Sequence, residues 1–436
     1  MSTTKTNWGE RAADKSTAAA LAYRAAFALF LVGVAIVPFM RPFNVKLLGS
    51  VTQIADLVFA LTGLVWAGSV VLSRGQVLRR GRFYLFIGAY LAAMAVTTVV
   101  APHKSLSRIV IQLYLVGLSV LSYNLVRTPA SLRRTSLVWV GSAVFTAVLI
   151  LLSAVLFYLV GLKDPKVNPV LWTAGSLPVG NYPRVRGFFE NGNMTGNYLA
   201  LSSCLSVGLA AVDPKLRRAG LIAAATMSAA ALFTLSTALG GLALAIGIFA
   251  WVYQNDTKRW GGLRALFPFA VLGAIGLMIF TAGYPKRTDA GVVLAASPRW
   301  LTWNSSWHSF LKHPLFGNGL GVPLADIYYD APRGVHEHLT DPHNAWLSVG
   351  GQLGLLGLAA FIALLGWLAR GLRRLSFTSS DQAAPLRTVL LGGLVIVVYQ
   401  AFSCSLEDMR HVWLLFGLMA GVIEEESREV VAQLES

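Results

Sequence analysis

Residues 137–160 read LVWVGSAVFTAVLILLSAVLFYLV, a stretch of 24 residues without a charged side chain. A run of about 20 apolar residues forms a helix long enough to cross the hydrocarbon core of a bilayer. The whole chain has the same character, because 55% of its 436 residues are hydrophobic and only 13% are charged, against roughly 25% in ordinary globular proteins. The composition excludes a soluble protein and indicates a polytopic membrane protein.

Further apolar stretches of similar length follow one another along the chain. In hydrocarbon each segment must satisfy its own backbone polar groups, and continuous apolar runs favour helices over the alternating strands of a membrane barrel. The sequence therefore predicts an all-α integral membrane protein with about 12 transmembrane helices, in a single membrane domain over residues 1–436. The predicted crossings are residues 25–40, 51–72, 83–100, 109–125, 137–160, 194–212, 219–235, 238–253, 265–282, 345–368, 389–404 and 412–423.

The formal charge of +16 raises the question of nucleic-acid binding. With the N-terminus inside, however, most of the 36 Lys and Arg residues fall in inner segments, as the positive-inside rule requires. Arg79, Arg80 and Arg82, for example, crowd one short inner turn. We interpret them as topology anchors, expect no nucleic-acid partner, and predict that both termini are cytoplasmic.

Cys204 and Cys404 lie in apolar segments and define neither a disulfide framework nor a metal site.

Two outer connections are long, residues 161–193 and 283–343. Long loops in a compact domain are usually functional, so we expect the chemistry there. Both loops also carry basic residues on the side of the membrane where the orientation rule disfavours them. An anionic substrate would explain these cations.

The first long loop ends with two arginines and two amides close to the next crossing. Arg184 and Arg186 are two residues apart, and guanidinium groups bind phosphate in a bidentate manner. Asn191 or Asn193 is expected to cap the following helix. The alternative is that the arginines extend to lipid headgroups without binding a substrate.

The second long loop contains a segment with an aromatic face. Trp300, Trp303 and Trp307 recur at helical spacing, which predicts an amphipathic helix lying in the outer interface. The tryptophans fit an aromatic belt that anchors the helix better than they fit sugar stacking. Arg299 stands at the start of this helix, where anchoring alone does not explain it, and is a candidate phosphate ligand.

Residues 336–344 read HEHLTDPHN and lead into the crossing at 345–368. Asp341 suits the N-cap and Pro342 the first helical position, which would place His343 in the first turn. The positive end of the helix would then keep His343 neutral near pH 7, as a general base requires. His338 is the second candidate, and the alternative for either residue is a passive interfacial position. The spacing of these histidines matches no tetrahedral metal site, and we predict none.

Taken together, these motifs resemble the O-antigen ligase family. The resemblance rests on Arg-Gly-Phe-Phe at 186–189 with Asn191 and Asn193, on HPLFGNGLG at 313–321, and on His343-Asn344 followed after nine residues by Gly354 and Gly357. It implies a bacterial inner-membrane enzyme with a periplasmic active site in lipopolysaccharide biosynthesis. Such enzymes transfer a glycan from undecaprenyl pyrophosphate to a sugar hydroxyl of the lipid A-core, without metal or nucleotide cofactor.

By position, His343 matches the base of the family, and Arg186 and Arg299 match its pyrophosphate-contacting arginines. Asn344 lies within the His-Asn motif and is a further candidate. One departure is visible: relatives often carry a Ser-Arg pair where this chain has Ser236-Thr237. That contact is either missing or supplied by another residue such as Arg184.

Rival functions share parts of this pattern. An O-antigen polymerase or a protein-directed oligosaccharyltransferase would use the same donor and differ only in the acceptor. A flippase or transporter would need ionisable groups within the crossings or broken segments in corresponding halves, and the predicted crossings are nearly free of charge. The sequence favours the ligase, with the lipid-linked glycan, the lipid A-core acceptor and membrane lipids as its partners.

Overall fold

The computed structural model describes the chain apart from residues 1–6, 42–43, 48–49, 103–104, 175–182, 253–285, 289–290, 294–297, 332–334, 379–383 and 436. Its helices are α1 (Asn7–Ile36), α2 (Ile54–Leu72), α3 (Phe83–Val100), α4 (Leu106–Leu125), α5 (Pro129–Val155), α6 (Gly192–Val212), α7 (Arg217–Leu232), α8 (Ala238–Val252), α11 (Pro298–Lys312), α12 (Ala345–Thr378), α13 (Ala384–Gln400) and α14 (Arg410–Glu435). A π-helical turn, Leu156–Val160, extends α5, and a short 3₁₀ turn, Leu406–Asp408, precedes α14.

Seven of the described helices are long and apolar enough to cross a membrane. They cover Thr17–Ile36, Ile54–Leu72, Phe83–Val100, Leu106–Leu125, Pro129–Val160, Gly192–Val212 and Ala345–Arg374. The helical, multi-pass membrane class is therefore confirmed, and one predicted crossing, residues 83–100, coincides with α3. The predicted crossing at 265–282 lies outside the described residues, and the total of about 12 crossings stays a prediction.

Within the described residues, four antiparallel hairpins accompany the helices, and they were not predicted. They pair β1 (Asn44–Leu47) with β2 (Ser50–Gln53), β3 (Leu171–Ala174) with β4 (Pro183–Val185), β5 (Lys286–Thr288) with β6 (Gly291–Val293), and β7 (Ile327–Ala331) with β8 (Val335–Leu339). Strand pairing satisfies backbone polar groups in loop segments that are not helical.

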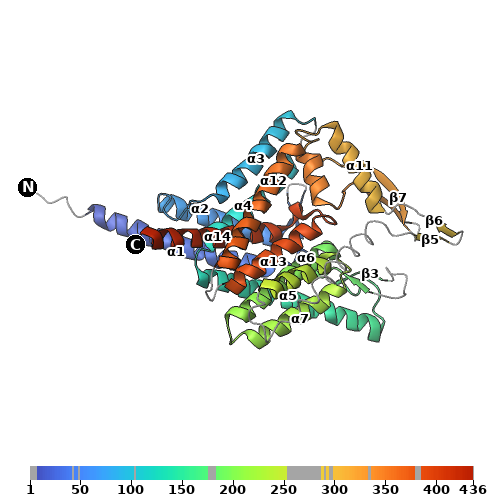
Figure 1. Cartoon of the computed structure of the whole chain (residues 1–436), viewed down its shortest axis with the longest axis horizontal. Helices are drawn as coiled ribbons and strands as arrows, with labels where there is room; N and C mark the ends of the chain where they lie inside the picture. Colours follow the sequence, from blue (N-terminus) through green and yellow to red (C-terminus); the bar gives the residue numbers. More distant parts are fainter. Residues whose placement is uncertain are drawn as a thin grey trace, which may run out of the picture.

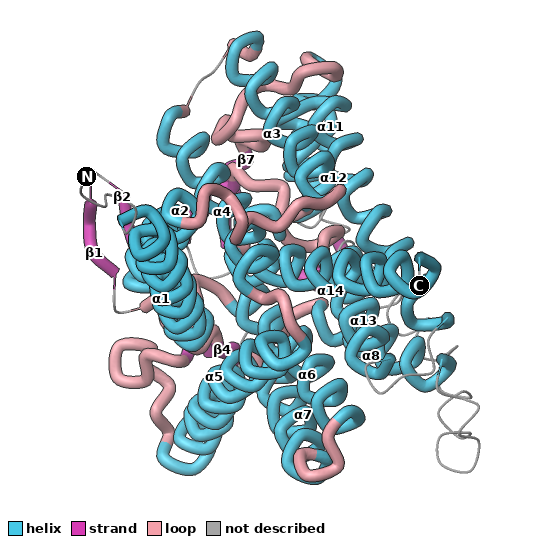
Figure 2. The backbone as a smooth tube through the Cα atoms, turned by 90° about the vertical axis from the view of Figure 1, so that its left-hand side faces the viewer, coloured by secondary structure: helices cyan, strands magenta, loops and turns pink. Residues whose placement is uncertain are grey.

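The hairpins within the two long loops gather at one end of the molecule. Figure 1 shows β3, β5, β6 and β7 at the end opposite to the two chain termini. Seen along the bundle in Figure 2, α5, α6, α7, α8 and α13 form one group of helices, while α3, α11 and α12 lie together on another side. The long loops and the termini therefore belong to opposite ends of the bundle.

Buried polar contacts fix the helices where the long loops meet the bundle. Gln400, at the end of α13, donates from Nε2 to the Asn193 carbonyl (3.1 Å) and to Ser236 Oγ (3.0 Å). Its amide oxygen accepts from Asn197, whose own Oδ1 lies 2.8 Å from His411 Nε2. A buried hydrogen-bond network of this kind holds α6, α13, α14 and the turn before α8 in one arrangement.

Helix α12 is broken at Gly354, which has φ 68° and ψ −167°. The loop 313–321 fills the break: Leu355 N–H donates to the Pro314 carbonyl (2.7 Å), and Asn318 N–H donates to the Gly351 carbonyl (2.9 Å). Backbone groups released by a break at membrane depth need such partners. The two glycine-containing motifs that carry the family resemblance are therefore packed against each other.

Candidate functional site

Arg184 on strand β4 and Arg299 at the start of helix α11 lie within electrostatic range of each other. Val185 N–H bonds to the Phe233 carbonyl (2.9 Å), and Arg184 Nε donates to the Thr234 carbonyl (3.4 Å), so β4 is seated on the end of α7. Burial, and secondarily the charge of Arg299, lower the pKa of Arg184 to about 10. Burial also lowers the pKa of Arg299. Two mostly buried cations thus lie within range of each other, an arrangement that favours an anion between them.

In the described parts of the two long outer loops, two buried guanidinium nitrogens are left without an acceptor. Among the described residues, the buried atoms Arg299 Nη1 and Arg186 Nε have no hydrogen-bond partner. Leaving a charged donor unsatisfied away from water costs about 1–3 kcal/mol or more. An anionic ligand with several acceptor oxygens would remove this cost.

Arg186 has a different set of charged neighbours. Burial first, and then the charge of Arg41, lower its pKa, while Glu190 raises it. The main chain around it is firmly held, because Arg186 N–H donates to the Val170 carbonyl (3.0 Å) and Met40 N–H to the Phe188 carbonyl (3.1 Å). Arg41 was not among the residues singled out from the sequence. Its signal was its place on the outer side of the first crossing, where the orientation rule disfavours a cation.

His343 does not lie in the first turn of a helix, so the expected cap is wrong. Helix α12 begins at Ala345, and the Asn344 side chain accepts the Leu347 N–H (3.1 Å) as its N-cap. Asp341 accepts the His343 N–H (2.8 Å), and this local turn competes with helix formation. His343 therefore precedes the helix, in the left-handed region with φ 48°.

Asp341 also lies beside the ring of His343. Its Oδ2 is 3.8 Å from His343 Nδ1, and both side chains are 45% exposed. Asp341 Oδ1 additionally accepts from the Ser405 hydroxyl (2.6 Å). The imidazole is thus reachable from solvent, with a fixed carboxylate next to one of its nitrogens.

Helix α11 is tied to the His343 loop. Trp303 Nε1, one turn after Arg299, donates to the Pro342 carbonyl (2.9 Å). Cys404 lies within electrostatic range of both Arg299 and Asp341. The arginine and histidine candidates of the second long loop are therefore neighbours in the structure.

The interfacial position expected for this helix agrees with its exposure. Trp300 and Trp307 are 57% and 48% exposed, whereas Thr302 and Ser306 are buried. The aromatic face is turned outward, as an anchor in the headgroup layer requires. Trp303 departs from this pattern because its indole binds the His343 loop.

His338 lies on the exposed hairpin β7–β8. Its Nε2 is 2.6 Å from Asp326 Oδ1, and its ring stacks on Tyr328 with centroids 4.4 Å apart. The cross-strand pair Tyr328 and His338 stabilises the hairpin. These contacts explain His338 without a substrate.

The three candidate asparagines have different surroundings. Asn191 caps α6 by accepting the Met194 N–H (3.0 Å), as expected from the sequence. Asn193 is buried, and its Oδ1 has no partner among the described residues. Asn344 is occupied at both ends of its amide, since Nδ2 also donates to the Phe402 carbonyl (3.3 Å). Of the three, Asn193 alone has a buried side-chain atom without a hydrogen-bond partner in the described part of the chain.

A sequence model of the O-antigen ligase family matches residues 222–362. The resemblance to the O-antigen ligase family is confirmed. The matched segment includes Arg299, the loop 313–321, His343 and Gly354. No curated protein matches the chain.

The family match indicates the general class of the protein. The match covers less than half of the chain, and with the seven long apolar helices it supports a multi-pass membrane protein with a segment similar to O-antigen ligases. Arg184 and Arg186 lie outside the matched segment.

Proposed function

We propose that this protein is an O-antigen ligase, a metal-independent inverting glycosyltransferase of the inner membrane. It would transfer O-antigen glycan from undecaprenyl pyrophosphate to a sugar hydroxyl of the lipid A-core. The observation that carries this proposal is the pair Arg184 and Arg299, with a buried Arg299 N–H that lacks an acceptor in the described structure, next to the loop that bears His343.

In this scheme the arginines bind the donor pyrophosphate at headgroup depth. Two guanidinium groups neutralise charge on the departing pyrophosphate, which a metal ion does in many other enzymes. Arg184 also lies against the Thr234 carbonyl, beside the turn at Ser236 where relatives often carry an arginine. We therefore infer that Arg184 supplies that missing contact. Arg186, with Arg41 nearby, extends the positive surface.

His343 acts as the general base. The acceptor hydroxyl attacks the anomeric carbon, its proton passes to the imidazole, and the C–O bond to the pyrophosphate breaks with inversion. The neighbouring Asp341 carboxylate stabilises the imidazolium that forms. Proton transfer of this kind contributes roughly 10² to 10⁴ in rate. The positive φ of His343 fits a functional position, because strained backbone is retained where the surroundings enforce it.

Both lipid substrates dictate where the site lies. The donor and the acceptor are anchored in the outer leaflet, so the loops 161–193 and 283–343 face the periplasm and both termini face the cytoplasm. The full bundle has about 12 crossings in this proposal. The site opens to the bilayer as well as to water, with α11 at its rim.

The test is transfer in vitro with purified protein, lipid-linked glycan and lipid A-core acceptor, in buffer containing EDTA and read on a gel. The wild-type protein should produce a shifted lipopolysaccharide band. His343→Ala should abolish it with normal membrane insertion, and His338→Ala, the matched control, should retain most of the activity.

Other outcomes would decide against parts of the scheme. A ladder of lengthened donor would identify a polymerase. Loss of activity in EDTA that is restored by divalent metal would contradict a metal-independent reaction. Near-normal transfer by His343→Ala would exclude it as the base.

A further inference from the structure

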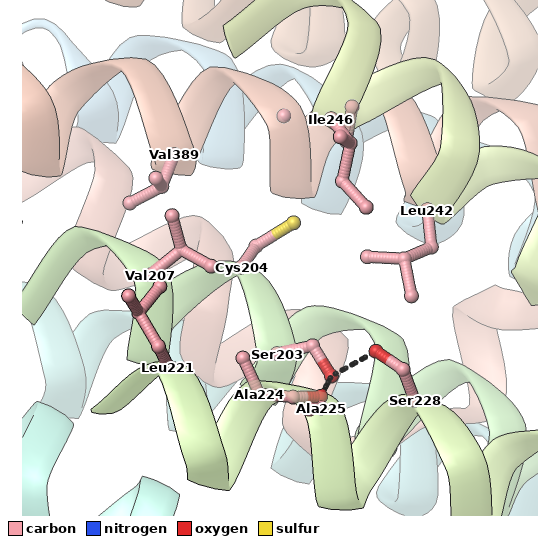
Figure 3. Close-up of a pocket in the computed structure, with 12 residues that line it drawn as sticks. Ser203, Cys204, Val207, Leu221, Ala224, Ala225, Ser228, Leu242, Ile246 and Val389 are labelled. Atoms are coloured by element: carbon pink, nitrogen blue, oxygen red, sulfur yellow. Dashed lines mark hydrogen bonds between the residues drawn. The ribbon is translucent and has the colours of Figure 1, made fainter. Parts of the chain in front are cut away.

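An apolar cavity of about 260 Å³ lies among four helices of the bundle. Its walls come from α6, α7, α8 and α13, and Figure 3 shows Cys204, Leu221, Leu242, Ile246 and Val389 around the space. The polar groups among the residues that line it are occupied. Ser228 Oγ donates to Ser203 Oγ (3.4 Å), and Ser203 Oγ donates to the Leu199 carbonyl (2.9 Å). The cavity thus offers almost only hydrocarbon surface.

The helices that line the cavity also reach the candidate site. Helix α6 begins at the Asn191 cap, and α7 ends just before Phe233 and Thr234, which hold β4 and Arg184. Gln400, at the end of α13, bonds to Asn193 and to the turn before α8. The cavity therefore lies along the same helices, and it opens to the outside of the bundle, where Leu221, Ala225 and Ile246 are exposed.

The separation between the two sites follows from helix geometry. Ser203 lines the cavity and follows Asn193 by ten residues in α6. At about 1.5 Å rise per residue, Ser203 lies about 15 Å from Asn193 along the axis of α6, and Asn193 stands at the end of the helix where β4 carries Arg184. In the proposed site the pyrophosphate lies at headgroup depth, so the tail of such a lipid would extend from the loop end of α6 into the hydrocarbon core, along the helices that line the cavity.

We propose that this cavity binds a part of the isoprenoid tail of the donor. The proposal rests on the proposed function. An apolar cavity of about 150 Å³ takes up benzene, so this one holds roughly ten carbon atoms, the size of two isoprene units. A branched, unsaturated tail fills a fixed cavity lined by small residues such as Ala224, Ala225 and Ala245. The cavity thereby sets the path of the tail and the depth at which the pyrophosphate is presented.

The expected gain in affinity is moderate. Lipid acyl chains are as apolar as the cavity, so moving the tail from the bilayer into the cavity gains no hydrophobic free energy. The gain comes only from closer packing of the tail against fixed side chains. Filling the cavity should therefore raise the KM for a long-tailed donor roughly threefold to tenfold. A geranyl tail is too short to reach the cavity from the arginines and should be unaffected.

The first test compares two donors in nanodiscs, glycan on undecaprenyl pyrophosphate and the same glycan on geranyl pyrophosphate. Ala225→Leu fills the cavity, and Ala229→Leu, one turn later on α7 and outside the lining, is the matched control. Ala225→Leu should raise the KM for the undecaprenyl donor alone, and Ala229→Leu should change neither KM. Equal KM values in both variants, or an equal rise for both donors, would overturn the proposal.

A second test requires no transfer and so separates this proposal from the proposed function. Undecaprenyl pyrophosphate with a diazirine on the isoprene units about 15 Å from the headgroup is photolysed with the wild-type protein, and the labelled peptides are identified by mass spectrometry. Labels should fall on the α6, α7, α8 and α13 segments that line the cavity, and decrease in Ala225→Leu. Labels confined to α11 or α12 would overturn the assignment, whether or not the protein transfers glycan.

Discussion

Arg184 and Arg299 are the residues on which the electrostatics of the site depends most. Burial lowers the pKa of both guanidinium groups, the charge of Arg299 lowers the pKa of Arg184 further, and Arg299 keeps a donor without a protein acceptor in the described structure. The sequence made both arginines candidate phosphate ligands, because cations in outer loops violate the orientation rule. It could not predict that Arg184, rather than Arg186, would lie with Arg299, because the two residues are far apart in the chain and no local pattern pairs them.

Substitution of these arginines should reduce transfer in a graded way. Arg184→Ala and Arg299→Ala should each lower kcat/KM roughly 10- to 100-fold, the loss of a charge-assisted hydrogen bond. The Lys variants should be intermediate, since Lys keeps the charge but loses the planar fork. Arg217→Ala, at the other end of α7, is the control and should be neutral. Equal activity of the Lys and Ala forms would contradict bidentate phosphate contact.

Glu407 gives the protein a pH-dependent stability. It is 3% exposed in the turn before α14, and burial, followed by the charge of Asp408, raises its pKa well above the usual value. A carboxyl whose pKa is raised by folding stabilises the folded state at low pH, and this stability is lost as the pH rises through the raised pKa. Glu407→Gln should therefore have a higher Tm than the wild type at pH 8, with a smaller difference at pH 5. Parallel Tm curves across this pH range would show that Glu407 does not titrate as described.

The His343 loop shows the limit of local rules at the residue scale. Asp341 and Asn344 are both good N-cap residues, and the Asp-Pro pair favoured the earlier start. The structure uses Asn344 as the cap and Asp341 for a turn ahead of it, which leaves His343 outside the helix. The choice is determined by tertiary contacts, among them the Trp303 bond to Pro342 and the Ser405 bond to Asp341.

Among the elements, the break in helix α12 is the feature that the sequence explains best, because glycines stand where the loop and the helix meet. A Cβ at Gly354 would lie 2.3 Å from the Leu315 carbonyl oxygen, and one at Gly317 would lie 2.2 Å from the Gln352 carbonyl oxygen. Both residues also have positive φ, which favours glycine. The glycines therefore allow the loop 313–321 to enter the break that positions the first part of α12 behind His343.

Alanine substitutions test this packing. Gly317→Ala and Gly354→Ala should each destabilise the protein by more than about 1 kcal/mol, because they add both a clash and backbone strain. Gly366→Ala, in the same helix with no atom within 4 Å of its added Cβ, should be neutral or slightly stabilising. Thermal unfolding in one detergent compares the three. A Gly354→Ala protein as stable as Gly366→Ala would show that the break is not required.

Element prediction succeeded where the hydrophobic signal was long and failed where it was short. Seven described apolar helices overlap predicted crossings, and a helix, α11, covers the predicted aromatic segment. The hairpins were missed because strands of three to five residues carry too little alternation to be recognised. The break at Gly354 was hidden because the residues on both sides of it remain apolar.

For the whole molecule, the arrangement of hairpins and termini at opposite ends (Figure 1) predicts the topology in the membrane. A membrane-impermeant thiol reagent should label Tyr328→Cys, on the exposed hairpin β7–β8, in intact cells. It should label Lys215→Cys, in the turn between α6 and α7, only after permeabilisation. Both native cysteines are buried, which limits background labelling. The reverse labelling pattern would invert the proposed orientation.

The class of the molecule was predictable because hydrophobic length and charge asymmetry act over the entire chain. The family followed from a few motif residues in the outer loops, whose functions hydropathy does not reveal. The site itself required the structure, because it is assembled from a strand before α6, the start of α11 and the loop before α12.

The most direct measurement is a cryo-EM map of the protein in nanodiscs with undecaprenyl pyrophosphate. We expect the pyrophosphate within hydrogen-bond distance of the Arg184 and Arg299 guanidinium groups, at the end of the bundle that carries the hairpins, with His343 on the side open to the acceptor. A pyrophosphate bound away from both arginines, or at the end where the termini lie, would contradict this account.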